Sequence, residues 1–135
     1  MLIQEKTIED IPVAYVAKQG HPSAVASKAF WELEQKVSFK GNKFYGVFDE
    51  NKNEYRACVA INKTNQDALS GLAHGTISGG LYVYTVLKGE YNYIVRQVGP
   101  TFTTLTEKYT KDISRPSIEF YTRHTEVIVM LPINK

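Results

Sequence analysis

Glu119 and Tyr121 are the residues whose types and spacing could do chemistry. They stand two positions apart in the segment Ser117–Arg123, and its sequence SIEFYTR is typical of a β-strand. Alternate residues of a strand face the same side, so Glu119 and Tyr121 should share a face that the apolar Ile118 does not. A carboxylate beside a phenol could pair with a cation, or exchange a proton with a water molecule. Alternation alone favours a plainer interpretation, in which this polar face meets solvent.

Other chemistry-bearing residues form no recognisable site. His21, His74 and His124 lie in separate turns, and no two of them have the spacing of metal ligands. Cys58 is the single cysteine and is interpreted as a small strand residue. The glycine pair Gly79-Gly80 lacks the flanking pattern of a phosphate-binding loop. We therefore expect neither a metal nor another cofactor.

The first half of the chain predicts a strand, a helix and two hairpin-linked strands. The glycine at position 20 and the proline at position 22 mark the first turn, and apolar residues at three- and four-residue spacing follow it. The predicted elements are a strand at Ile11–Gly20, a helix from Ser23 to Val37, and strands at Phe44–Phe48 and Tyr55–Asn62.

The same order returns after a polar connector, Lys63–Gly75. The predicted elements are a strand at Leu81–Gly89, a helix within Tyr91–Asp112 that Gly99 and Pro100 should kink or split, and strands at Ser117–Arg123 and Glu126–Ile133. Gly20 and Gly89 end matching strands, and Ile61-Asn62-Lys63 recurs as Ile133-Asn134-Lys135. The sequence therefore predicts one α+β domain over 1–135, built from duplicated βαββ units at about 8–63 and 76–135 that a pseudo-twofold axis relates. Ligand sites often form at such junctions.

Composition excludes several classes of protein. The 135 residues fit one domain, and a net charge of +2 is too small for a nucleic-acid-binding surface. No apolar stretch resembles a signal peptide or approaches the about 20 residues of a membrane span, so we expect a cytoplasmic protein that does not enter a membrane. The nine tyrosines favour a binding surface, although aromatic sheets also use tyrosine for packing.

Three segments, together with the twice-written βαββ order, resemble a known family. They are Ile77-Ser78-Gly79-Gly80-Leu81-Tyr82, Pro116-Ser117-Ile118-Glu119-Phe120-Tyr121 and Leu131-Pro132-Ile133. In their order and spacing, from about Ile8 to Ile133, they resemble the GyrI-like small-molecule-binding family. That family also supplies the effector-binding domain of AraC-type and MerR-type transcription regulators.

The resemblance implies a curved antiparallel sheet, two main helices and a central groove at the pseudo-twofold. Such grooves accept lipophilic, often cationic aromatic compounds, and Glu119 matches a glutamate that typically lies in them. About ten residues precede the first predicted strand and none follow the last, so no helix-turn-helix fits and we expect no direct DNA binding. The Gly99-Pro100 pair leaves the residues of the second helix wall open.

Further groove residues are hypotheses with plain alternatives. Tyr121, Tyr84, Tyr93 and Tyr82 could line the groove or serve ordinary packing. Trp31 could be a core residue, a pocket lid or a ligand contact. Aligning the two units places Gly46 against Glu119, where a glycine would leave room for a ligand or mark a bulge.

Two functions remain from different classes. The first is a stand-alone protein that senses or sequesters small hydrophobic or cationic ligands, with Glu119 as the counter-charge. The alternative is a hydrolase that detoxifies reactive electrophilic compounds in the same groove, with Glu119 as general base or acid and Tyr121 as hydrogen-bond donor. Some stand-alone members of the family are thought to do this. A third possibility, an inhibitor of a DNA-handling enzyme, would need a partner surface that the sequence does not identify.

Overall fold

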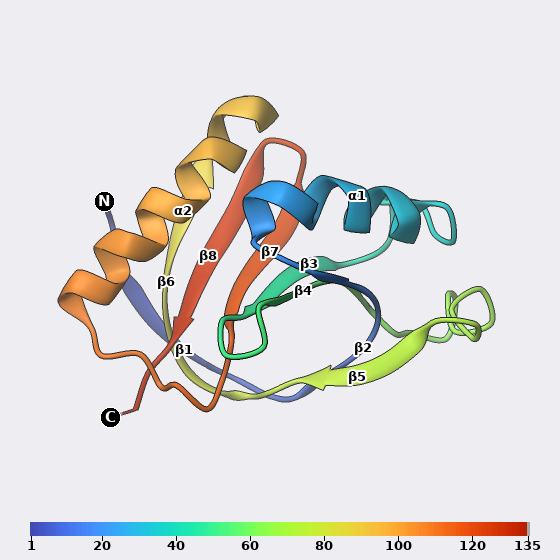
Figure 1. Cartoon of the computed structure of the whole chain (residues 1–135), viewed down its shortest axis with the longest axis horizontal. Coiled ribbons are helices and arrows are strands. Elements are labelled where there is room, and N and C mark those ends of the chain that lie inside the picture. Colours follow the sequence, from blue (N-terminus) through green and yellow to red (C-terminus); the bar gives the residue numbers. More distant parts are fainter. Residues whose placement is uncertain (135) are drawn as a thin grey trace.

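The computed structural model describes residues 1–134, in which two helices cover one face of a single sheet (Figure 1). Within these residues the sheet has eight strands in the order β1-β6-β8-β7-β3-β4-β2-β5, and all neighbouring pairs are antiparallel. The strands are β1 (Gln4–Ile8), β2 (Ile11–Gln19), β3 (Phe44–Asp49), β4 (Glu54–Ala60), β5 (Ala73–Ile77), β6 (Gly80–Lys88), β7 (Ser117–Arg123) and β8 (Glu126–Pro132). The helices are α1 (Pro22–Glu34) and α2 (Tyr91–Lys108). The expected α+β class, the curved antiparallel sheet and the two main helices are confirmed.

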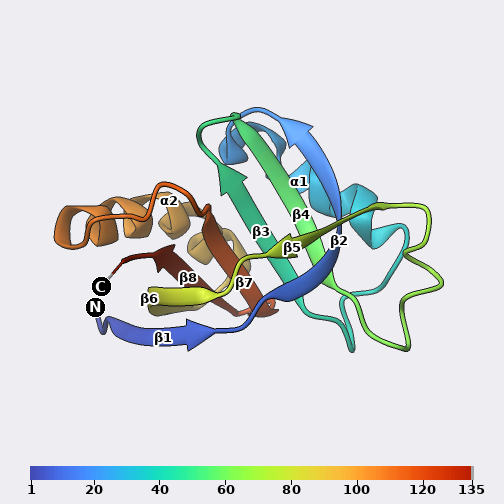
Figure 2. The ribbon, with the colours of Figure 1, turned by 90° about the horizontal axis from the view of Figure 1, so that it is seen from below.

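The sheet curls into a half-barrel. Strands β1 and β2 are consecutive in the chain, yet β1 is one edge of the sheet and β2 is next to the other edge. The short link between them therefore brings the two ends of the sheet toward each other, as the view from below shows (Figure 2). In that view both helices lie behind the sheet, so the sheet has one face that the helices cover and one face that they leave uncovered.

Strands β3 and β7 lie at the middle of the sheet and are largely buried on both faces. Alternate residues of these strands belong to different hydrophobic clusters. Phe44 packs under α1, while Tyr45 and Ile118 belong to a cluster on the uncovered face. A third cluster packs β6 and β8 against α2 through residues such as Val83 and Leu105. Burial on both faces explains why β3 is a nearly continuous apolar run, whereas β7 carries the polar residue Glu119 on its helix-covered face.

Helix α1 begins at Pro22, one residue before the predicted start at Ser23, and its N-cap is His21. The Nδ1 atom of His21 accepts a hydrogen bond from the Ser23 amide, 3.1 Å away, and Pro22 occupies the first turn. Helix α2 is a single helix that runs through Gly99 and Pro100, so the alternative of two separate helices is wrong. Buried contacts of Ile94, Val98 and Leu105 hold both sides of the proline against the sheet.

Two strands were not predicted. Strand β1 lies within the ten residues placed before the first strand, and β5 occupies the end of the polar connector. Both are edge strands with mostly exposed side chains, so neither needs the apolar alternation by which a strand is recognised.

The order strand, helix, strand, strand occurs twice, as β2–α1–β3–β4 and β6–α2–β7–β8. A pseudo-twofold axis between two units, with the limits 8–63 and 76–135, stays a prediction. The last residue of the recurring Ile-Asn-Lys motif, Lys135, lies outside the described residues.

Candidate functional site

Glu119 lies on the central strand β7 with its side chain on the helix-covered face. Its neighbours across the ladder are Gly46 of β3 and Val129 of β8. Only 6% of the residue is exposed to solvent. A carboxylate in the middle of a sheet, under two helices, is therefore the opposite of the solvent-facing residue that alternation alone favours.

Two tyrosine hydroxyls hold one oxygen of this carboxylate. The hydroxyl of Tyr121 donates to Glu119 Oε1 over 2.5 Å, and the hydroxyl of Tyr55 donates to the same oxygen over 3.2 Å. The other oxygen, Oε2, accepts no hydrogen bond from residues 1–134. The site thus presents a desolvated carboxylate with one oxygen still available to a partner.

Burial raises the pKa of Glu119 above its ordinary value, and the hydrogen bonds from Tyr121 and Tyr55 partly oppose that rise. Burial and the neighbouring carboxylate also raise the pKa of both tyrosines well above 10, so the phenols stay protonated and act as donors. A cation close to the carboxylate would favour its charged form, whereas a neutral guest would leave that charge unpaired.

Gly46 makes this arrangement possible. A methyl group added at residue 46 would overlap the hydroxyl oxygen of Tyr55 and lie 2.8 Å from Glu119 Oε1. The pairing of β3 with β7 is regular at this point, so the glycine does not mark a bulge. The space that its missing side chain leaves is filled by the Tyr55 hydroxyl and the carboxylate.

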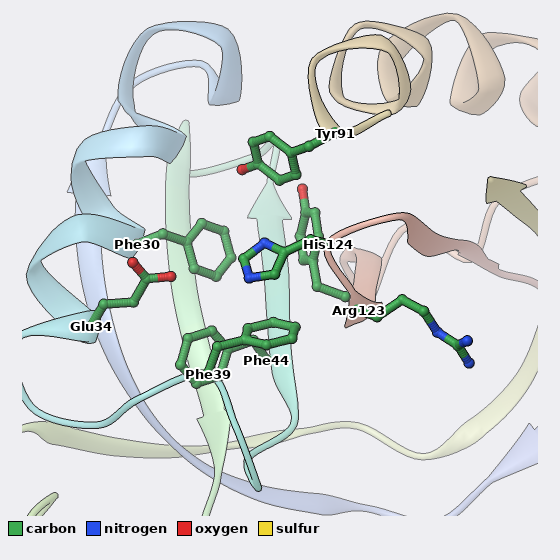
Figure 3. A pocket seen from close by; sticks show the side chains of 8 residues that line it. Phe30, Glu34, Phe39, Phe44, Tyr91, Arg123 and His124 are labelled. Atoms are coloured by element: carbon green, nitrogen blue, oxygen red, sulfur yellow. The ribbon is translucent and has the colours of Figure 1, made fainter. Parts of the chain in front are cut away.

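Above Tyr121 an open cavity of about 240 Å³ lies where α1, the start of α2 and the β7–β8 turn approach one another (Figure 3). Most of its walls are aromatic. The lining residues are Phe30, Glu34, Phe39, Phe44, Tyr91, Tyr121, Arg123 and His124. Tyr121 joins this cavity to the carboxylate, because the same side chain lines the one and donates to the other.

The aromatic rings of the cavity pack against one another rather than standing alone. The ring of Phe30 meets that of Tyr121 edge-on with centroids 5.3 Å apart, and Phe39 meets Phe44 edge-on at 5.2 Å. The imidazole of His124 lies over Phe39 at 4.8 Å. Such mutual support fixes the wall geometry, which reduces the entropy that a bound ligand must overcome.

The two charged residues at the rim of the cavity are oriented differently. The carboxylate of Glu34 lies beside Phe30 at the mouth of the cavity, whereas the side chain of Arg123 extends away from it (Figure 3). Arg123 also has an acidic neighbour, with Nη2 3.7 Å from Glu126 Oε2. The cavity therefore combines aromatic walls with a carboxylate below Tyr121 and another at its rim, a pattern that suits a flat or bulky cation.

The predicted site residues fall into three groups. Tyr121 lines the cavity, and Glu119 and Gly46 lie next to Tyr121 in the sheet without lining the cavity themselves. Tyr82 and Tyr84 lie on the opposite face of the sheet, where Tyr82 is fully buried and donates to the Ser78 carbonyl over 2.6 Å.

The two remaining predicted residues are on the surface. Tyr93 on α2 is 54% exposed and Trp31 on α1 is 62% exposed. Neither lines the cavity below the helices.

Sequence reasoning missed most of the cavity wall. Phe39, Phe44 and His124 come from a loop, a strand and a turn that only the fold brings together. Tyr55 had one usable signal: a glycine opposite an acid in a central strand invites a side chain from the neighbouring strand to fill the gap.

Comparisons with known proteins agree with this geometry. A family model described as the GyrI-like small molecule binding domain matches residues 1–130. No curated protein matches the sequence. Among residues 1–134, no helix is long and apolar enough to cross a membrane.

Solved structures share the fold at low sequence identity. An integron cassette protein from the mobile metagenome of Vibrio cholerae has a TM-score of 0.75 at 13% identity, over 98% of this chain and 95% of that one. SAV2435 bound to tetraphenylphosphonium has a TM-score of 0.69 at 13% identity, over 99% and 94%. A hydrolase from Listeria innocua has a TM-score of 0.55 at 10% identity, over 98% and 91%.

Proposed function

Since the chain belongs to the GyrI-like small-molecule-binding domain family, we propose that it binds lipophilic aromatic cations in the cavity between α1 and α2, with Glu119 as the counter-charge. One observation carries the proposal: a buried carboxylate, held by two tyrosine hydroxyls, lies under the aromatic wall of that cavity. The biological role would be sensing or sequestration of such compounds in the cytoplasm.

The chemistry of the walls supports a cation over a neutral guest. Aromatic faces attract a weakly hydrated cation by about 0.5–2 kcal/mol per contact. In its charged form the Glu119 carboxylate supplies a negative charge in a site with little water, where charge pairs are strongest, and a cation favours that form. A delocalised cation loses little hydration energy when it enters, so both terms favour it. That SAV2435 has been seen with tetraphenylphosphonium, on the same fold, agrees with this class of ligand.

The test compares two ions of nearly the same shape and opposite charge. Tetraphenylphosphonium and tetraphenylborate are titrated by calorimetry into the wild type, Glu119→Gln and Glu107→Gln; Glu107 is an exposed acid on α2. We expect the wild type and Glu107→Gln to bind the cation equally, and Glu119→Gln to bind it at least about tenfold more weakly, which is about 1.4 kcal/mol. If the wild type and Glu119→Gln bound the cation with equal affinity, Glu119 would not be the counter-charge of the site.

Hydrolysis is a second candidate that the same geometry supports. A carboxyl group of raised pKa, 2.5 Å from a phenol, could exchange a proton with water and with a leaving oxygen. A hydrolase from Listeria innocua shares the fold. Incubation of the protein with small electrophilic substrates such as epoxides and activated esters tests this candidate. Product that grows with time in the wild type, and is lost in Glu119→Gln, would favour the enzyme over the binder.

A further inference from the structure

A second cavity lies on the other face of the sheet, which no helix of residues 1–134 covers. It has a volume of about 240 Å³ and lies inside the curl of the half-barrel. Residues of β1, β2, β3, β6, β7 and β8 line it. The ribbon of the sheet curls around this side (Figure 2). We call it the inner cavity and describe its walls by the residues below.

The floor and walls of the inner cavity are apolar. The rings of Tyr45 and Phe120 stack with centroids 4.6 Å apart and an interplanar angle of 17°. Ile118 and Met130 are buried beside them, while Phe120 and Tyr84 are only partly buried. A sheet face of this kind holds apolar surface that water would otherwise cover.

Among residues 1–134, the charged side chains that line the inner cavity are those of Lys6 and Lys43. Lys6 shares its face of β1 with Ile8, and Lys43 lies just before β3 and lines the same cavity as Tyr45. Neither ammonium group forms a salt bridge with any acid in residues 1–134.

The hydroxyl of Tyr45 adds a hydrogen-bond donor. Tyr45 is 5% exposed and lines the inner cavity, yet its hydroxyl makes no hydrogen bond within the described part of the chain. Burial raises the pKa of Tyr45, so the phenol keeps its proton. The hydroxyl oxygen is not among the fully buried atoms that lack a partner, so it is accessible from the cavity and can donate to a ligand oxygen.

We propose that the inner cavity binds a small amphiphilic anion, that is, a carboxylate or sulfonate joined to an apolar chain. The chain would lie on the apolar floor, and the anionic oxygens would meet the two ammonium groups and the Tyr45 hydroxyl. The molecule would then hold two sites of opposite preference, an acidic one under the helices and a basic one inside the curl. This second site does not depend on the proposed cation site, so either proposal can fail while the other holds.

Four isoleucines make the site directly observable. The wild type, labelled at isoleucine methyl groups, is titrated with decanoate and separately with decyltrimethylammonium, both below their micelle concentrations. The two probes have the same chain and opposite charge. Methyl signals of Ile8, Ile11, Ile118 and Ile128 report on the inner cavity, and Ile94, on the buried face of α2, reports on the rest of the fold.

We expect decanoate to shift the four inner-cavity signals saturably, and decyltrimethylammonium to leave them at least about fivefold less responsive. The double variant Lys6→Gln/Lys43→Gln should weaken decanoate at least about fivefold, and Tyr45→Phe about two- to threefold. Lys63→Gln, which changes an exposed lysine outside the cavity, should bind as the wild type does.

Three results would overturn the proposal. In the first, decanoate shifts no inner-cavity signal, or shifts Ile94 to the same extent. In the second, the two probes bind alike, which would make the cavity an apolar surface without charge preference. In the third, the four signals move with protein concentration alone, which would make this face an interface between copies of the chain.

Discussion

Glu119 lies directly opposite Gly46 in the β3–β7 ladder, and the position of a missing side chain at residue 46 is taken by the Tyr55 hydroxyl and by Glu119 Oε1. The glycine, the acid and the tyrosine come from three adjacent strands, β3, β7 and β4. They form one packed unit, in which a polar cluster is buried only because one strand offers no side chain. Its energetics can be tested one residue at a time.

Gly46→Ala should destabilise the fold by about 1–3 kcal/mol, since the added methyl group meets a fully buried tyrosine that cannot move aside. Urea unfolding measures the change. Gly71→Ala is the matched control, because nothing lies within 4 Å of a methyl group at that position, and it should leave the midpoint almost unchanged. The double variant Gly46→Ala/Tyr55→Phe should recover part of the loss. A Gly46→Ala protein as stable as the wild type would contradict the close packing described here.

The tyrosine hydroxyls should set the protonation of Glu119. Each donates to the carboxylate and favours its charged form, with Tyr121 the larger influence. Tyr121→Phe should therefore raise the pKa of Glu119 above its wild-type value, and Tyr55→Phe should raise it by less. Carbon NMR of the glutamate carboxyl, followed over pH, measures both. If Tyr121→Phe lowered the pKa or left it unchanged, the hydrogen bond would not act as described.

Stability should depend on pH through the same carboxyl group. The pKa of Glu119 in the folded protein lies above its ordinary value of 4.5, so between the two values the folded state binds more protons than the unfolded state. Stability therefore falls as pH rises from about 4.5 through the raised pKa, and the loss is absent below 4.5. Glu119→Gln removes this group and should lose less stability than the wild type over that window.

Urea unfolding at a series of pH values compares the two proteins, with Glu107→Gln as an exposed control that should follow the wild type. Parallel curves for wild type and Glu119→Gln would show that the buried acid does not titrate in this range.

The sequence was informative about β7 and the helices, and less so about the walls of the site. Period-two alternation placed Glu119 and Tyr121 on one face, and the structure joins them by a hydrogen bond. Alternation also placed Tyr82 and Tyr84 together, but it cannot say which face of a sheet the helices will cover, and these two lie on the other one.

The rest of the site depends on register and on loops. Tyr55 reaches Glu119 only because of the exact pairing of β3 with β4 and β7, which no local pattern encodes. Phe39 and His124 lie between predicted elements, where residues carry little periodic signal. The edge strands β1 and β5 were not predicted for a related reason. Water can hydrogen-bond the free backbone edge of each and covers most of its side chains, so neither strand needs a recognisable apolar pattern.

Cation binding should strengthen with pH because a cation stabilises the charged form of Glu119. Below the raised pKa, the carboxyl group must release a proton when tetraphenylphosphonium binds, so affinity should rise by up to about tenfold per pH unit and level off above that pKa. Glu119→Gln should bind weakly with little dependence on pH, and Glu107→Gln should reproduce the wild-type curve. Calorimetry in buffers of different ionisation enthalpy measures the released proton directly. A wild-type affinity that stays flat across the range, with no proton released, would mean that the cation does not meet the Glu119 carboxylate, even if it binds in the aromatic cavity.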